Sequence, residues 1–104
     1  MVITIRIGDE VRSFAEASES WINQQINRRR VEGQNVCVEV SISTSGLNLR
    51  LATPGCGSGG GGGRPPTANE RAVLDLWSKL GLLSSDFTGG NLVAFLKQLR
   101  RLLG

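Results

Sequence analysis

A run of glycines divides this chain of 104 residues into two parts of different character. The run occupies most of 55–63 and is followed by Arg64 and two prolines. Before it the sequence alternates as strands do, and after it apolar residues recur at helical spacing. Because glycine weakens both helices and strands, regular structure is not expected to continue through this run. We therefore predict residues 53–66 to be a flexible, disordered Gly-rich linker between a first part, 1–52, and a second part, 67–104.

The glycine run also contains the pattern G-x-G-x-x-G at 55–60, which is the fingerprint of a dinucleotide-binding turn. In that fold a helix begins directly at the glycines, and its N-terminus meets the pyrophosphate. Here the prolines at 65–66 come before the next helical segment. A phosphate-binding loop of the Gly-Lys-Ser/Thr type is also absent, because Gly63 is followed by Arg64. We therefore expect a tether rather than a phosphate site, and no cofactor.

The first part has three segments in which apolar and polar residues alternate, at 2–7, 36–42 and 47–51. This alternation predicts three strands, each with one aliphatic face. Between the first two strands, apolar residues at helical spacing predict a helix from about residue 12 to residue 30. The β-α-β-β order favours a parallel crossover between the first two strands and an antiparallel hairpin between the last two. The result would be a two-layer α+β arrangement with a polar outer face on the sheet.

The second part predicts a helical hairpin. Thr67 and Glu70 have the spacing of a capping box, which starts a helix that Gly81 ends. A leucine-rich helix follows over about 90–103. A hairpin of this length buries too little surface to be stable alone, so we expect it to dock on the first part as one compact domain. A monomer is favoured, and a dimer that exchanges this hairpin between two chains is the alternative.

Basic residues form two clusters, each at the end of a predicted helix. The net charge of +3 comes entirely from residues 53–104, because six basic and six acidic residues balance before them. Cations stabilise the C-terminus of a helix, so solvated helix ends are one interpretation of both clusters. Contact with an acidic protein surface or with nucleic acid is the other. The candidate binding residues are Arg28, Arg29, Arg30, Lys97, Arg100 and Arg101.

The chain has no histidine and only two cysteines, Cys37 and Cys56. Without an imidazole neither thiol has a base to activate it, and two cysteines alone fall short of a zinc ligand set. We therefore expect no enzymatic activity, no catalytic residues and no metal. The cysteines lack CxxC spacing and the chain opens on a strand rather than a signal peptide, which favours free thiols and a cytoplasmic location. No apolar run approaches the roughly 20 residues of a membrane span, so no membrane association is expected.

These exclusions favour a small non-enzymatic protein-interaction or adaptor protein that binds a protein partner. Its contact surfaces would be the polar sheet face and the leucine-rich hairpin. The alternative is a nucleic-acid-binding regulator that uses the basic helix ends, although the final helix offers few side chains that read base edges. An enzyme would need a deep pocket lined by acidic groups such as Asp9, Glu10 and Asp86.

Overall fold

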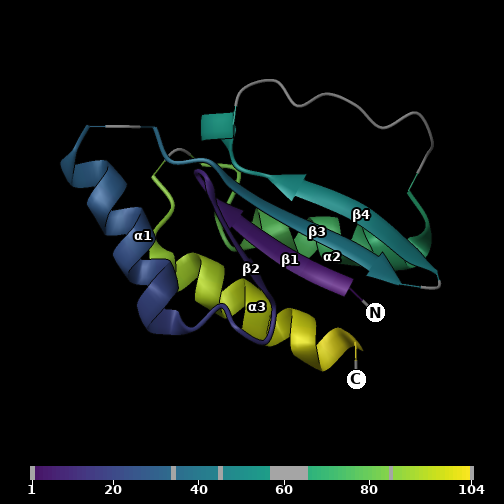
Figure 1. Cartoon of the computed structure of the whole chain (residues 1–104). Helices are drawn as coiled ribbons and strands as arrows, with labels where there is room; N and C mark the ends of the chain where they lie inside the picture. Colours follow the sequence, from purple (N-terminus) through teal and green to yellow (C-terminus); the bar gives the residue numbers. More distant parts are fainter. Residues whose placement is uncertain (1, 34, 45, 57–65, 85, 104) are drawn as a thin grey trace.

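The computed structural model of the chain describes residues 2–33, 35–44, 46–56, 66–84 and 86–103. It contains a four-stranded antiparallel sheet and three α-helices, so the predicted α+β class is confirmed (Figure 1). The strands are β1 (Val2–Ile7), β2 (Glu10–Ser13), β3 (Val38–Thr44) and β4 (Leu47–Ala52). The helices are α1 (Glu19–Val31), α2 (Ala68–Lys79) and α3 (Gly89–Leu103), and a short 3-10 helix, η1 (Pro54–Cys56), follows β4. The glycine run predicted to be disordered, residues 57–65, lies outside the described residues.

One face of the sheet carries the core. The strand order is β2-β1-β3-β4, and the register aligns Ile5, Val40 and Leu51 across three strands. All three are buried, whereas Ser41 and Arg50, one position along, face the other side and are half-buried or exposed. Helix α2 packs against β4, and α3 packs against α1. The helices add these residues to the same cluster: Trp21, Ile22 and Ile26 from α1, Val73 and Trp77 from α2, and Leu92, Phe95, Leu96 and Leu99 from α3.

The helix predicted over 12–30 is wrong at its start. Gly8 adopts a φ of 65°, a conformation that residues with a Cβ rarely take, and the turn at Gly8–Asp9 reverses the chain into β2. Helix α1 begins only at Glu19, because Ser18 caps it by accepting a hydrogen bond from the Trp21 N–H at 3.1 Å. The residues before Ser18 therefore belong to a strand and a connection rather than to the helix.

The predicted parallel crossover is also wrong, because β1 pairs antiparallel with β3 from Val2–Ser43 to Ile7–Val38. The cause is the hairpin of β1 and β2, which adds one reversal of the chain. The chain leaves β2 at the end of the sheet where β1 begins, and α1 carries it back to the opposite end. Strand β3 then has to run antiparallel to β1. The predicted antiparallel pairing of the last two strands, β3 and β4, is confirmed.

Helix α2 is fastened to the edge of the sheet at its first turn. The predicted capping box is confirmed: Thr67 Oγ1 accepts the Glu70 N–H at 3.3 Å, and Glu70 Oε1 accepts the Thr67 N–H at 3.0 Å. The second carboxylate oxygen, Oε2, accepts the backbone N–H of Asn48 in β4 at 2.9 Å. Glu70 is 2% exposed, so a buried carboxylate links the start of α2 to the outer edge of β4.

Cys37 and Cys56 form a disulfide, so the prediction of two free thiols is wrong. Non-covalent contacts bring the two segments together as well. Thr53 Oγ1 accepts the Val38 N–H at 3.0 Å, and the Thr53 N–H donates to the Val38 carbonyl at 3.0 Å. Residues 53–56, which begin the predicted linker, are thus attached to the start of β3. The disulfide removes one of the two arguments for a cytoplasmic location, the expected free thiols, because disulfides persist mainly in oxidising environments.

Candidate binding groove

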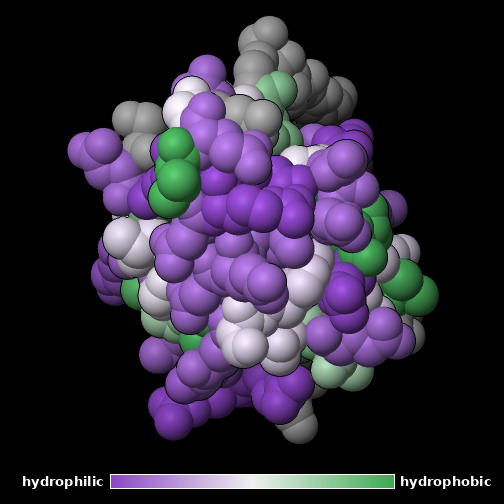
Figure 2. Space-filling view, turned by 60° about the vertical axis from the view of Figure 1, so that its left-hand side comes forward, coloured by the Kyte–Doolittle hydropathy of each residue, from purple (hydrophilic) through white to green (hydrophobic). Residues whose placement is uncertain are grey.

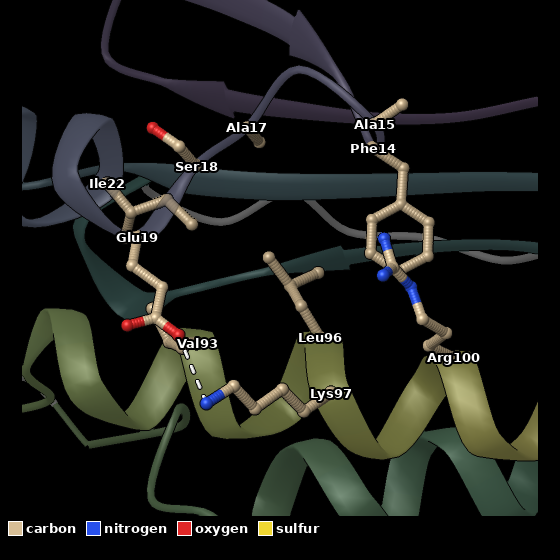
Figure 3. A pocket seen from close by; sticks show the side chains of 10 residues that line it. All are labelled: Phe14, Ala15, Ala17, Ser18, Glu19, Ile22, Val93, Leu96, Lys97 and Arg100. Carbon is tan, nitrogen blue, oxygen red and sulfur yellow. Dashed lines mark ion pairs between the residues drawn. The ribbon is translucent and has the colours of Figure 1, made fainter.

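An open groove of about 260 Å³ lies between residues 14–19, which form the connection before α1 and its first residue, and one face of α3 (Figure 3). Ile22 of α1 and Leu96 of α3 are buried beneath it. The accessible apolar surface comes from Phe14, Ala15 and Ala17 on one side and from Val93 on the other. Sites that enclose a whole small molecule usually measure roughly 300–1,000 Å³. The groove is below that range, so its size suits one or two side chains of a partner better than a cofactor.

The wall formed by residues 14–19 is held by backbone hydrogen bonds. The Phe14 N–H donates to the Ile3 carbonyl at 2.9 Å, which extends the pairing of β2 with β1 by one residue. A tight turn follows, in which the Ala17 N–H donates to the Ser13 carbonyl at 3.0 Å. Ser18 then caps α1. The groove wall is therefore part of the sheet and helix framework.

Charged side chains from both walls form the rim of the groove. Lys97 Nζ lies 3.0 Å from Glu19 Oε1, and both side chains are more than half exposed. The Arg100 guanidinium lies 5.1 Å from the centroid of the Phe14 ring, in the geometry of a cation–π contact. Exposed ion pairs contribute only about 0–1 kcal/mol, so Lys97 can exchange Glu19 for a partner carboxylate at small cost. The rim thus carries two cations and one replaceable anion.

The lining residues do not assemble a catalytic set. Ser18 is occupied as the helix cap, and Glu19 is the one carboxylate among the described lining residues. The chain contains no histidine, so a hydroxyl here has no imidazole to activate it. The chemistry available in the groove is apolar contact combined with hydrogen bonding from lysine and arginine.

The predicted basic cluster at the end of α1 is largely used within the fold. Arg29 is 6% exposed, and its Nη2 lies 2.7 Å from Asp9 Oδ1, which ties the β1–β2 turn to α1. Arg30 donates to the Phe87 carbonyl, and its guanidinium lies 5.0 Å from the Phe87 ring centroid. Arg28 is exposed. The structure therefore leaves Arg28 as the most accessible cation of this cluster.

The second predicted cluster is divided by the groove. Lys97 and Arg100 line it, whereas Arg101 is exposed and outside its lining. Lys97 pairs with Glu19, the first residue of α1, while Arg28–Arg30 lie in the last turn of the same helix. At about 1.5 Å per residue, the two clusters are roughly 15 Å apart along α1. They do not merge into one basic surface.

The helix predicted from about residue 12 includes Phe14, and neither Phe14 nor Glu19 is among the binding residues predicted from the sequence. The placement of Phe14 follows from starting the helix too early, before the cap at Ser18. A signal was present in the sequence: Gly8-Asp9 stands between two short strand-like segments, which is typical of a two-residue hairpin. Ser18 directly before Glu19 is a typical helix cap with an acidic first turn. The partners of Lys97 and Arg100 become visible only when α3 is placed against α1.

A second charged cluster lies on the polar face of the sheet, beside the disulfide. Glu39 stands between Arg6 and Arg50, with N–O distances of 2.6 and 3.0 Å. The sulfurs of Cys37 and Cys56 and a Glu39 oxygen lie within 4.8 Å of one another. However, the two sulfurs are bonded together and the carboxylate is shared by two guanidinium groups. This donor set does not fit a metal ion in the disulfide-bonded chain.

The surface on the α1 side is mostly hydrophilic, and its hydrophobic residues are separated from one another (Figure 2). Within the described ranges, no helix is both long enough and apolar enough to cross a membrane.

The chain matches no protein-family model, no curated protein and no solved structure.

Proposed function

We propose that this protein is a small non-enzymatic interaction protein that binds an acidic segment of a partner protein in the groove beside α3. One observation carries the proposal: an apolar groove sized for one or two side chains is bordered by Lys97 and Arg100. An aliphatic or aromatic residue of the partner would contact Phe14, Ala17 and Val93, which are the partly exposed apolar residues of the lining. Carboxylates on either side of it would pair with the two rim cations.

Nucleic acid is supported less well as a ligand. Affinity for a phosphate backbone grows with the number of cations that contact it together. Arg29 is buried and paired with Asp9, and the remaining cations of the two clusters lie at opposite ends of α1. The groove cations also flank an apolar floor rather than an extended basic track. An acidic peptide with one apolar residue matches this arrangement better.

The proposal predicts a defined peptide preference. From a displayed library of random peptides, the purified protein should enrich sequences with Asp or Glu around a single Leu, Ile or Phe. A synthetic peptide of this type should bind the double variant Lys97→Glu, Arg100→Glu at least about tenfold more weakly in isothermal titration calorimetry, because attraction to two carboxylates becomes repulsion.

Arg101→Glu is the control for each of the two substitutions, since it reverses one positive charge on the same helix outside the groove. It should leave the affinity within about twofold. Equal binding by the double variant, or a library that enriches no acidic sequences, would contradict the groove. A salt-dependent mobility shift with duplex or single-stranded DNA, reduced by Arg28→Glu, would instead support nucleic-acid binding.

A further inference from the structure

The two outer edges of the sheet differ in their availability. At the β4 edge, Glu70 of α2 accepts the Asn48 N–H, and α2 packs against the strand. At the other edge, all four residues of β2 are exposed, and Val11 is 56% exposed. An open strand edge presents unpaired N–H and C=O groups that can pair with another strand. Strand β2 is therefore the more available edge.

The hydrogen-bonding pattern fixes which residues of β2 face outward. The Phe14 N–H donates to the Ile3 carbonyl, so Phe14 directs its backbone groups toward β1. In an antiparallel pair this direction alternates from residue to residue. Glu10 and Arg12 therefore also face β1, whereas Val11 and Ser13 direct their N–H and C=O groups away from the sheet.

We propose that two copies of this chain pair antiparallel through β2, about a two-fold axis at Val11, so that their sheets become continuous. Val11 and Ser13 direct their backbone N–H and C=O groups away from the sheet. Val11 can therefore pair with Val11 of the second copy, with an N–H to C=O hydrogen bond in each direction. This register places Glu10 opposite Arg12 of the second copy, once on each side of the axis. Registers centred on Glu10 or on Arg12 would place identical charges opposite each other, which is destabilising.

The side chains agree with this register. Glu10 and Arg12 pair with Ile7 and Ile5 of β1, so both lie on the helix-covered face of the sheet. The Arg12 guanidinium lies 5.1 Å from the centroid of the Trp21 ring, which holds the side chain near the strand. Val11 lies on the opposite face, where the two exposed Val11 side chains would contact each other across the axis.

The strand is short, so the interface is small. Stable protein interfaces usually bury about 1,200–2,000 Å², and a pairing of two four-residue strands is expected to bury less than that. We therefore expect a weak dimer with a Kd of roughly 10–100 μM, seen in concentration-dependent sedimentation.

Charge exchange at the edge tests the register. Glu10→Arg alone places arginines opposite arginines, and Arg12→Glu alone places glutamates opposite glutamates; each should weaken self-association at least about tenfold. The double exchange Glu10→Arg, Arg12→Glu should restore it, although it also lacks the contact of Arg12 with Trp21. Mixing the two single variants should give a heterodimer, because one edge is then entirely basic and its partner entirely acidic.

Hydrogen exchange supplies a second measurement. The Val11 amide should become more protected as the protein concentration rises, whereas the Asn48 amide, already bonded to Glu70, should not change. Sedimentation as a monomer up to about 0.5 mM would overturn the proposal. The proposal would also be overturned if the Kd of self-association were the same for all three charge variants as for the wild-type protein. That result is expected for a hairpin-exchanged dimer.

Discussion

Replacing Cys37 and Cys56 together by serine is expected to lower the free energy of unfolding by about 3 kcal/mol. The disulfide closes a loop with a sequence separation of 19, and the chain-entropy treatment gives about this value for a loop of that length. The physical reason is that the bridge restricts the unfolded chain more than the folded one. Urea denaturation of the oxidised protein and of the double variant would measure the difference, as would reduction of the wild-type protein by dithiothreitol.

The folded structure should survive this loss. Thr53 is hydrogen-bonded to Val38 on both its backbone and its side chain. Gly55 lies so close to the Val36 carbonyl that a Cβ would not fit between them, so this segment packs against the start of β3 without the bridge. The reduced protein should therefore keep its near-UV circular dichroism at low temperature. Identical urea midpoints for the oxidised and reduced protein would contradict the predicted stabilisation.

Glu70→Ala should have an effect of similar size, with the free energy of unfolding reduced by roughly 3 kcal/mol. The substitution removes the reciprocal half of the capping box, worth about 1 kcal/mol. It also removes a charge-assisted hydrogen bond to the Asn48 N–H, worth about 1.5–3 kcal/mol. Thermal unfolding of a chain of this size should shift downward by roughly 15 °C.

Two further variants separate the role of this carboxylate from a general effect of losing charge on α2. Glu70→Gln keeps one carbonyl oxygen as an acceptor and should cost about half as much as Glu70→Ala. Asp75→Ala removes an exposed carboxylate from the same helix and should change stability by less than about 0.5 kcal/mol. If the alanine variants at 70 and 75 are equally stable, Glu70 does not fasten α2 to β4.

The sequence pattern predicted correctly those elements whose formation depends on residues close together in the chain. Strict alternation located β3 and β4, and the Thr67–Glu70 spacing located the start of α2. The early start given to α1 had a physical cause: Phe14 and Ala17 contact the core from the connection before the helix, at a spacing that imitates a helical stripe. This one error removed β2 from the prediction and reversed the direction expected for β3.

The disulfide and the groove depend on contacts between distant segments. Two cysteines without a motif carry no pairing information, and their approach depends on the way β3 and η1 meet. Lys97 and Arg100 were selected as candidates by charge alone. What distinguishes them from Arg101 is the position of α3 against Glu19 and Phe14, which no local pattern in the sequence contains.

The position of Glu70 at the β4 edge has a consequence for assembly. A sheet with two free edges can accept one copy after another and grow into a fibre. Here a strand added beside β4 would have to displace a buried carboxylate from the Asn48 N–H. Growth of the sheet is thereby directed to β2, and pairing there about a two-fold axis uses up the free edge of both copies. Such an assembly ends at two chains, so opening the β4 edge, as Glu70→Ala does, would also remove a barrier to polymerisation.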